Sequence, residues 1–349
     1  MSSRLRVVVA SPLSEELCAL IEEREPRIDL VRDQSLLPAQ RHAGDHHGDP
    51  AFTRTDEQQA RFDELVDSAE ALYGLPDERP RALARTVAAN PNLRWVHTTP
   101  AGGGAQVKGA HLDDEALQRI VFSQSGGVHA EPLAEFALLG VLAGLKHLPV
   151  LIAAKAEHRW ADRRTTGVIA DQTVVVVGLG GIGRAVAQKF SVLGARVIGV
   201  HRREVEASGV ERIVPVEELA DVAKEATVIV MTLPGTASTE KMLSADVLAN
   251  VRPGTIVVNV GRGTTIDEPA LIDALRDGRV GFAALDVFAV EPLPEDSPIW
   301  SLPNVLVSPH AAALHPNEDR LIAELFAENA TRLLDGRELI NRVNTVEFY

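Results

Sequence analysis

Three side chains with proton-transfer or anion-binding chemistry each follow an apolar run in the C-terminal half of the chain. Arg262 comes after TIVVNV, Glu291 comes a turn after FAALDV, and His310 comes after NVLVSP. A protonated histidine can donate to a carbonyl oxygen that gains charge, and an arginine can hold an acidic substrate. A carboxylate beside the imidazole favours its charged form and fixes which nitrogen faces the substrate. The reduction of a 2-oxo acid requires this set.

Each of these residues also has a structural alternative when it is taken singly. Arg262 can flank a helix cap, Glu291 can be a surface acid before a proline, and His310 can be a hydrogen-bonded histidine. Because ligands bind beyond the carboxyl ends of strands in a doubly wound sheet, the arrival of all three at successive strand ends favours chemistry. Other histidines compete with His310 for the catalytic role: His97, His129 and His315.

A glycine-rich turn upstream of these residues is suited to bind a dinucleotide. The sequence GLGGIG follows the predicted strand TVVVV directly and opens a predicted helix. Gly178 permits the tight turn, Gly180 lets a pyrophosphate approach the backbone, and Gly183 lets the helix pack on the sheet. A tight turn without a ligand is the alternative, which the complete strand-turn-helix context disfavours.

The residues after the next strand bear on which nicotinamide cofactor is bound. An acidic residue about 20 positions after the glycines binds the ribose 2′-hydroxyl in NAD sites, but His201, Arg202 and Arg203 stand there. A carboxylate would repel a 2′-phosphate, whereas a guanidinium group donates paired hydrogen bonds to it. The sequence therefore predicts a preference for NADP(H), with NAD(H) possible if both arginines point into solvent.

The elements that must position these groups form two predicted α/β regions. Short strands alternate with helical segments from the N-terminus, and from Gln172 onward nearly all-apolar runs indicate parallel strands buried on both faces. We expect a boundary near Gly127, followed by a long buried helix in EPLAEFALLGVLAGLKHL. Asp267 can cap the helix EPALIDALRD and Gly278 can end it. One more amphipathic helix follows His310.

The segment LLPAQRHAGDHHGDPAFTRTDEQQ lacks a sustained period and is rich in Gly, Pro, Asp and His, so we predict a long surface loop. Its histidines and acids do not have a regular metal-ligand spacing, and we predict no metal site. The residues concerned are His42, Asp45, His46, His47 and Asp49.

The composition is that of a globular protein, with 45% hydrophobic and 24% charged residues in 349. A net charge of −14 argues against a nucleic-acid partner. Cys18, the only cysteine, cannot form an intramolecular disulfide and fits a packing role.

No apolar stretch has the length of a membrane span, and the N-terminal apolar run is too short for a secretory signal. We expect a cytoplasmic protein with neither a membrane nor a nucleic-acid partner.

The chain resembles the D-isomer-specific 2-hydroxyacid dehydrogenases, including glyoxylate and hydroxypyruvate reductases. The blocks VVVVGLGGIGRAVA, VNVGRGTTIDEPAL, LDVFAVEPLPEDSPIW and NVLVSPHAAA occur in the order of that family, and the similarity runs from about Leu93 onward. The resemblance implies two Rossmann-like or flavodoxin-like domains with doubly wound parallel sheets. It implies a discontinuous substrate domain, residues 1–127 and 311–349, and a dinucleotide-binding domain, residues 128–310. It also implies the catalytic roles of Arg262, Glu291 and His310.

Further binding residues are implied by the same resemblance. Backbone N–H groups near Gly102 and Gly103, in the turn TTPAGGG, would bind the substrate carboxylate together with Arg262 and His310. A homodimer and the D isomer of the product are also implied. The residues expected near the cofactor are Gly178, Gly180, Gly181, Ile182, Gly183, His201, Arg202, Arg203, Thr232, Pro234, Thr239, Val260, Gly261 and Asp286.

These observations predict an NADP(H)-preferring reductase that interconverts a small 2-oxo acid, such as glyoxylate or hydroxypyruvate, and its D-2-hydroxy acid. Two departures from the family leave the substrate's size open: the segment from His42 to Gln58 is long and polar, and AGGG replaces larger residues in the substrate turn. An NAD-linked dehydrogenase of a bulkier D-2-hydroxy acid remains an alternative. A non-catalytic, dinucleotide-sensing corepressor or scaffold is another.

Overall fold

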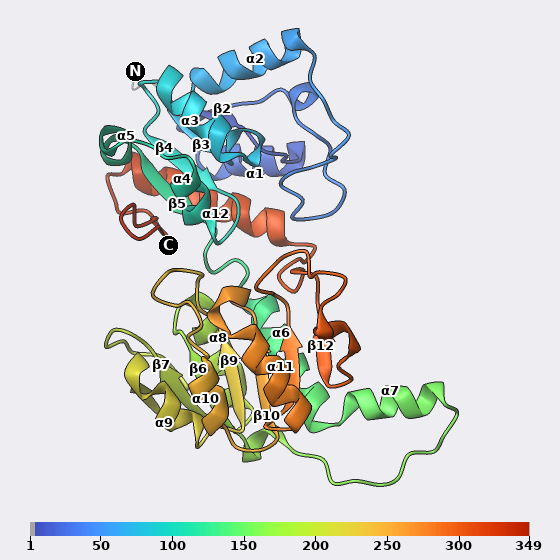
Figure 1. Ribbon diagram of the computed structural model, residues 1–349. Coiled ribbons are helices and arrows are strands. Elements are labelled where there is room, and N and C mark those ends of the chain that lie inside the picture. The colour runs from blue at the N-terminus through green and yellow to red at the C-terminus, as the bar shows by residue number, and fades with distance from the viewer. Residues whose placement is uncertain (1–3, 349) are drawn as a thin grey trace. The chain divides into compact units, whose positions relative to one another are not determined.

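The computed structural model describes residues 4–348, and the chain divides into two compact units. Unit 1 combines the N-terminal segment up to His129 with the segment from Leu314 onward, and unit 2 comprises residues 130–313. Figure 1 shows how the chain leaves the first unit and returns to it through α12 (Glu318–Leu334). The sequence analysis predicts that the chain passes from one domain to the other near residue 127 and returns near residue 310.

Unit 1 is built on a parallel sheet with the strand order β2-β1-β3-β4-β5. Its short strands alternate with helices along the chain, as predicted, and the strand order reverses between β1 and β3, as in a doubly wound fold. The strands are β1 (Leu5–Val9), β2 (Ile28–Val31), β3 (Ala71–Tyr73), β4 (Trp95–Thr98) and β5 (Val121–Gln124). The helices before the first crossing are α1 (Glu15–Arg24), α2 (Asp56–Asp67), α3 (Pro80–Ala89), α4 (Gly103–Gly109) and α5 (Asp114–Arg119).

The returning helix α12 completes the core of unit 1. The ring of Phe326 stacks on Trp95 with centroids 4.5 Å apart and meets Tyr73 edge-on at 5.2 Å. All three side chains are fully buried. Because aromatic side chains bury a large apolar area, α12 contributes strongly to the stability of this unit. The amphipathic helix that the sequence predicted after His310 therefore packs on residues far away in the chain.

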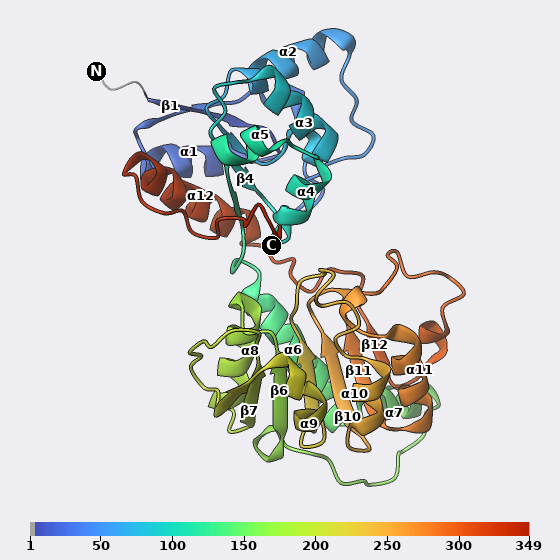
Figure 2. The same cartoon turned by 60° about the vertical axis from the view of Figure 1, so that its left-hand side comes forward.

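Unit 2 is built on a parallel sheet with the order β12-β11-β10-β9-β6-β7-β8. Its strands are apolar and mostly buried on both faces, as predicted, because helices cover both sides (Figure 2). The strands are β6 (Thr173–Val177), β7 (Arg196–Val200), β8 (Arg212–Val214), β9 (Val228–Met231), β10 (Thr255–Asn259), β11 (Val280–Leu285) and β12 (Val305–Val307). The helices are α6 (Ala130–Leu145), α7 (Leu148–Ala156), α8 (Gly181–Val192), α9 (Leu219–Ala223), α10 (Ala245–Asn250) and α11 (Glu268–Asp277).

Two helices of unit 2 follow the sequence expectations closely. The predicted long buried helix is α6, which packs on the sheet together with α8. Helix α11 begins where the side chain of Asp267 accepts a hydrogen bond from the Ala270 N–H. It ends at Gly278, which has a φ of 81°. These end residues set where the chain enters β11.

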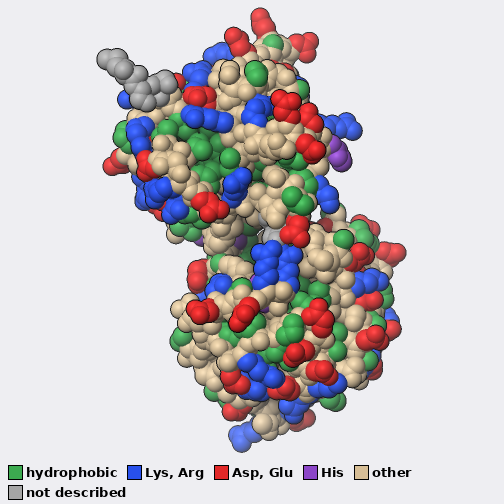
Figure 3. All heavy atoms as spheres, turned by 90° about the vertical axis from the view of Figure 1, so that its left-hand side faces the viewer, with side chains coloured by type: hydrophobic (Ala, Val, Ile, Leu, Met, Phe, Trp, Pro, Cys, Tyr) green, Lys and Arg blue, Asp and Glu red, His purple; other side chains and the backbone are tan. Residues whose placement is uncertain are grey.

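The molecular surface carries charges of both signs, and Figure 3 shows acidic and basic side chains interspersed over the face that it displays. Within residues 4–348, no single helix has the length and apolar composition needed to cross a membrane. Helices α6 and α7 meet those criteria only when taken together, and they are bent by 66° relative to one another.

Candidate active site

His310 and Glu291 form a direct pair at the carboxyl edge of the unit 2 sheet. The Nδ1 atom of His310 lies 2.7 Å from Oε2 of Glu291. The other carboxylate oxygen, Oε1, accepts a hydrogen bond of 3.0 Å from the Phe288 N–H. The histidine side chain is 46% exposed. Because Nδ1 is engaged by the carboxylate, Nε2 is the nitrogen that can face a substrate.

Asp286, at the end of β11, holds the loop that carries His310. Its Oδ1 atom accepts hydrogen bonds from the Ser308 hydroxyl at 2.6 Å and from the N–H groups of Ala311 and Ala312 at 2.9 and 3.0 Å. Its carbonyl oxygen accepts the N–H of His310 at 2.9 Å. His310 has a left-handed φ of 54°, which this buried carboxylate helps to maintain. The expected contact of Asp286 with a cofactor stays a prediction.

Arg262 lies on the loop that follows β10, and Asn259 shapes that loop. The side-chain oxygen of Asn259 accepts the Gly261 N–H at 3.0 Å, and its amide donates to the Arg262 carbonyl at 3.1 Å. Gly263 packs so closely on the backbone of Phe288 that a Cβ there would overlap it. The loops after β10 and β11 therefore touch. Asn259 was not among the predicted site residues, although its position at a strand end was a signal.

The guanidinium of Arg262 has few partners within its own unit. Its Nη1 donates to the Gly261 carbonyl at 2.7 Å, and the side chain is exposed. Desolvation by neighbouring atoms lowers the pKa of Arg262, while the charges of Glu291 and Asp286 raise it. An arginine remains charged at neutral pH under such opposing effects. The structure thus brings the guanidinium, Glu291 and His310 to the same edge of one sheet.

The competing histidines all lie in unit 1. His97 is buried, with Nδ1 2.8 Å from the Ser123 hydroxyl and Nε2 3.2 Å from the Ser125 hydroxyl. Burial lowers the pKa of His97 to about 3, so it is neutral and structural. The Nε2 atom of His129 lies 2.9 Å from Glu318, and Nδ1 of His315 accepts a local backbone N–H. Among these three histidines, only His129 is paired with a carboxylate in the way that His310 is. The His129 side chain is buried, however.

The glycine-rich turn lies between β6 and α8, as predicted. Gly178 has a φ of 98°, and a Cβ at Gly183 would overlap the carbonyl oxygen of Gly178. A Cβ at Gly180 would meet no atom within 4 Å, so this glycine borders open space. Helix α8 starts at Gly181 without a side-chain cap. Its first N–H groups are therefore suited to bind an anion such as a pyrophosphate.

Polar side chains around this turn brace it. The Thr232 hydroxyl lies within hydrogen-bond distance of the carbonyl oxygens of Val177 and Gly178, at 3.1 and 2.8 Å. Arg184, which the sequence analysis did not single out, donates to the carbonyls of Leu179 and Glu206. Its position directly after GLGGIG was the available signal.

The remaining residues expected near the cofactor lie on neighbouring loops. The Thr239 hydroxyl lies 2.6 Å from the Pro234 carbonyl within its own loop, and Val260 is buried. Direct contacts of Ile182, Thr232, Pro234, Thr239, Val260 and Gly261 with a cofactor stay predictions.

The basic segment, residues 201–203, directly follows β7, which is the second strand of the dinucleotide fold. Its two arginines are exposed. The His201 N–H donates to the Val214 carbonyl of β8 at 3.0 Å, and its Nδ1 accepts the Arg203 N–H at 3.2 Å. Arg202 and Arg203 are both exposed. No predicted strand corresponded to β8, because it is a three-residue edge strand with a weak apolar pattern. It nonetheless fixes the backbone of the basic segment.

The glycine turn of unit 1 is tightly packed at Gly103. A Cβ at Gly103 would overlap the Thr98 hydroxyl, so the position requires glycine. The Gly103 N–H donates to the Pro100 carbonyl at 3.3 Å and is therefore already engaged. Binding of a carboxylate by this turn stays a prediction that rests mainly on Gly102 and its neighbours.

The loop rich in His and Asp has no regular element between residues 37 and 55, as predicted, but it is not simply solvated. Asp45 is buried and pairs with Arg41 at 2.7 and 2.9 Å, which holds the pKa of this carboxyl far below its usual range. His46 packs between acidic side chains of α12. Among the residues that the structure describes, no group of three or more His, Cys, Asp or Glu side chains could hold a metal ion.

Comparisons with known proteins identify the family to which the chain is similar. Residues 138–312 match the family model described as "D-isomer specific 2-hydroxyacid dehydrogenase, NAD binding domain". The chain is 33% identical over 273 residues to a glyoxylate reductase of Korarchaeum cryptofilum, a match that covers 75% of this chain and 79% of that protein. It is 34% identical over 262 residues to the D-3-phosphoglycerate dehydrogenase of Mycobacterium tuberculosis, covering 75% of this chain but about half, 49%, of that longer protein.

A solved structure extends the similarity to the whole fold. The D-isomer specific 2-hydroxyacid dehydrogenase of Xanthobacter autotrophicus, crystallised with NADPH and MES, is 28% identical to this chain. The two superpose with a TM-score of 0.77, and the match covers 100% of each chain.

Proposed function

The chain belongs to the family of D-isomer-specific 2-hydroxyacid dehydrogenases, NAD(P)-dependent oxidoreductases, and from this premise we propose that it is an NADP(H)-preferring reductase of 2-oxo acids. Small substrates such as glyoxylate or hydroxypyruvate are the proposed starting point. The observation that carries the proposal is the 2.7 Å pair of His310 and Glu291. It lies at the strand ends where Arg262 also arrives, beside a glycine turn of dinucleotide type.

The cofactor fits the residues that are present. The space beside Gly180 and the uncapped start of α8 are suited to a pyrophosphate, and Arg202 and Arg203 are suited to a 2′-phosphate. When bound, NADPH supplies hydride to the carbonyl carbon of the substrate. Arg262 holds the carboxylate, and Nε2 of His310 donates a proton to the carbonyl oxygen. Glu291 stabilises the charged imidazole and fixes its tautomer.

The proposal is tested by the fall in absorbance of NADPH or NADH in the presence of glyoxylate, hydroxypyruvate, pyruvate or a branched 2-oxo acid. We expect turnover with glyoxylate or hydroxypyruvate, and a higher kcat/KM with NADPH than with NADH. Turnover of the branched acid alone would favour a dehydrogenase of bulkier substrates. If neither NADPH nor NADH is oxidised in the presence of any of these substrates, the proposal is contradicted and a dinucleotide-sensing scaffold is favoured.

Replacement of Arg202 and Arg203 by glutamine is expected to raise the KM for NADPH by about tenfold or more and to change the KM for NADH by less than about twofold. A hydrogen bond to a charged group contributes about 1.5–3 kcal/mol, which corresponds to a tenfold change or more. Steady-state kinetics with both cofactors measure the effect. Arg252→Gln, which removes an exposed charge elsewhere in unit 2, is the matched control. Equal effects on both cofactors would defeat the assignment.

We propose a homodimer that buries an apolar arm of unit 2. Figure 1 shows α7 extending beyond the sheet of unit 2. Ile152 on α7 is 60% exposed, and Trp160 after it is 95% exposed, with Leu148 and Leu151 exposed nearby. A monomer rarely leaves such side chains uncovered together, and a second copy of the same chain covers them most simply.

Sedimentation of the protein is expected to give twice the mass of the 37.5 kDa chain. Replacing both Leu151 and Ile152 with glutamate should give the monomer mass, because buried charges without partners oppose association. Val192→Glu changes an apolar residue on α8 that is even more exposed, at 80%, and should leave the dimer intact. A wild-type monomer at micromolar concentration would refute the proposed interface.

A further inference from the structure

The segment that follows β3 has two consecutive non-glycine residues in the left-handed region. Asp77 has a φ of 55° and Glu78 has a φ of 50°. This conformation is uncommon for such residues, and it persists only where surrounding contacts maintain it. Residues of this kind cluster at functional sites. The contacts of the two side chains therefore show what the segment holds in place.

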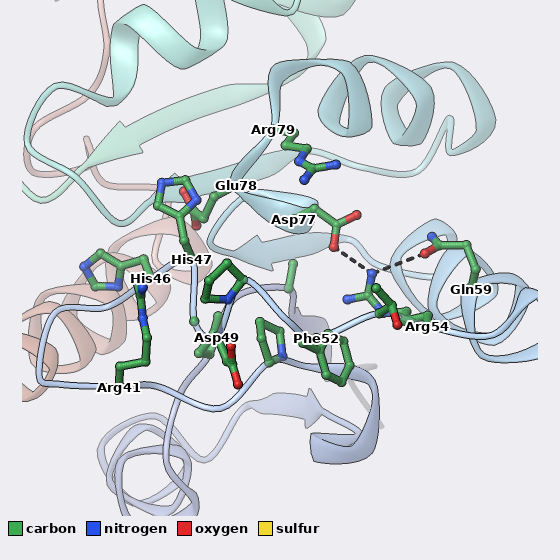
Figure 4. A pocket seen from close by; sticks show the side chains of 16 residues that line it. Arg41, His46, His47, Asp49, Phe52, Arg54, Gln59, Asp77, Glu78 and Arg79 are labelled. Carbon is green, nitrogen blue, oxygen red and sulfur yellow. Dashed lines mark hydrogen bonds and ion pairs between the residues drawn. The ribbon is translucent and has the colours of Figure 1, made fainter. Parts of the chain in front are cut away.

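The two carboxylates point in different directions (Figure 4). Asp77 lies 2.7 Å from the guanidinium of Arg54, whose side chain is 7% exposed and lies over the Phe62 ring. Glu78 points away from this pair, toward the side on which His47 lies. Glu78 is buried, with an exposed fraction of 5%. Because a buried carboxylate is costly unless hydrogen bonds satisfy its oxygens, the partners of Glu78 are structurally important.

Glu78 accepts hydrogen bonds from four different parts of unit 1. Its Oε1 atom accepts the Leu75 N–H at 3.3 Å, the Thr99 hydroxyl at 3.3 Å and the Ser11 hydroxyl. Its Oε2 atom accepts the side-chain amide of Gln106 at 3.1 Å. These donors lie just after β1, β3 and β4, and on α4. One carboxylate thus connects three strand ends and a helix.

Two of these donors flank the glycine turn, one on each side. Thr99 directly precedes Pro100, where the turn begins, and Gln106 lies on α4, the helix into which the turn leads. Each oxygen of Glu78 binds one flank. A carboxylate has two acceptor oxygens at a fixed separation, so it restrains two donors relative to one another. Glu78 therefore clamps the turn between its two ends.

Apolar packing does not fix the turn on this side. Glu78 lines a cavity of about 680 Å³ and also a smaller one of about 240 Å³. The smaller cavity is lined by Thr99, Pro100 and Gln106 as well. Because a cavity borders these residues, the carboxylate rather than close-packed side chains holds them in place.

We propose that Glu78 is a positioning residue for the glycine turn. By holding both flanks of residues 100–103, its carboxylate keeps the backbone N–H groups near Gly102 in the arrangement that binds an anion. All the contacts that support this inference lie within unit 1. The inference rests on the proposed function, which assigns the substrate carboxylate to this turn, and it adds the residue that fixes the turn. Glu78 acts through the turn and does not contact the substrate.

Glu78→Ala is expected to raise the KM for glyoxylate about tenfold, because a turn that adopts its binding arrangement a tenth of the time binds tenfold more weakly. A contact made equally in the ground state and the transition state changes KM and not kcat, so kcat should change by less than about threefold. Steady-state kinetics measure both constants. The Kd of NADPH, whose proposed site lies in unit 2, should be unchanged. Glu64→Ala, which removes an exposed carboxylate of α2, is the matched control.

Two milder variants carry the test if Glu78→Ala does not fold. Glu78→Gln can still hold both flanks, because its amide nitrogen can donate to Oε1 of Gln106, a buried atom without a hydrogen-bond partner among the described residues. We expect its KM to stay within about twofold of the wild type, since only the charge is lost. Gln106→Ala releases one flank and should raise the KM about fivefold, by the same loss of the binding arrangement.

Hydrogen exchange of the free protein examines the turn without a substrate. Amides of residues 101–106 should exchange about tenfold faster in Glu78→Ala, whereas Glu78→Gln should match the wild type and the rest of unit 1 should be unaffected. Faster exchange throughout unit 1 would indicate general destabilisation and reject the inference. A KM and an exchange rate that neither Glu78→Ala nor Gln106→Ala changes would also reject it.

The outcomes separate this inference from the function on which it rests. If the wild type reduces glyoxylate and Glu78→Gln loses as much kcat/KM as Glu78→Ala, the charge and not the clamp matters, and the inference alone is wrong. If the wild type reduces no 2-oxo acid, the proposed function fails, and hydrogen exchange decides the inference. Faster exchange confined to residues 101–106 in Glu78→Ala or Gln106→Ala then supports positioning of the turn by Glu78, and unchanged exchange rejects it.

Discussion

Replacing His310 with glutamine is expected to lower kcat for 2-oxo acid reduction about 10³-fold, within the range for loss of a general acid. Glutamine can still form a hydrogen bond, but it cannot deliver a proton to the carbonyl oxygen as charge develops there. The His310 side chain is partly exposed, and the backbone N–H of His310 donates to the Asp286 carbonyl whatever the side chain, so the fold should be unaffected. Steady-state kcat and the Kd of NADPH, measured by fluorescence, report chemistry and binding separately.

Two further variants sharpen this test. Glu291→Gln keeps a hydrogen-bonding group beside the imidazole but removes the charge, so we expect a smaller loss of about 10²-fold, at the lower end of the same range. His158→Gln is the matched control, because His158 is an exposed histidine of unit 2 with a φ of 52°, close to the 54° of His310. Retention of more than a tenth of wild-type kcat by His310→Gln would exclude it as the proton donor.

The fold could be predicted from sequence wherever local patterns determine it. The all-apolar runs from Thr173 onward indicate strands buried on both faces, and Asp267 and Gly278 mark both ends of α11. Strand β8 was missed because its three residues carry too short a pattern. The loop from residue 38 to 54 is predicted only as a surface loop, yet His46 lies between carboxylates of α12. That contact joins residues far apart in the chain, which no local periodicity reveals.

The candidate site shows the same division between local and long-range information. Arg262, Glu291 and His310 could be singled out because each follows a predicted strand, and parallel strands end at one edge. The role of Asp286 in holding the His310 loop could not be predicted, because the three hydrogen bonds that its Oδ1 atom accepts come from residues 308–312 and depend on the pairing of β11 with β12.

Replacement of Arg262 is the second change for which we expect a very large effect. Arg262→Gln should lower kcat/KM for every 2-oxo acid by about 10²–10³-fold, the scale for losing one preorganised donor at a reacting centre. Within its unit, the side chain donates only to the adjacent Gly261 carbonyl, whereas the loop is held through the Arg262 backbone by Asn259 and Thr265. The substitution therefore removes the charge and leaves the loop in place.

Lysine at this position distinguishes charge from geometry. Arg262→Lys keeps the positive charge but loses the planar fork that binds a carboxylate through two hydrogen bonds, so we expect it to recover only a small part of the lost kcat/KM. Kinetics of Arg262→Gln and Arg262→Lys with glyoxylate and NADPH measure the difference, and Arg276→Gln, an exposed arginine on α11, serves as the control. If the kcat/KM of Arg262→Lys equalled that of the wild type, a positive charge without the planar geometry of a guanidinium would be enough to bind the substrate. Paired recognition of the substrate carboxylate by Arg262 would then be wrong.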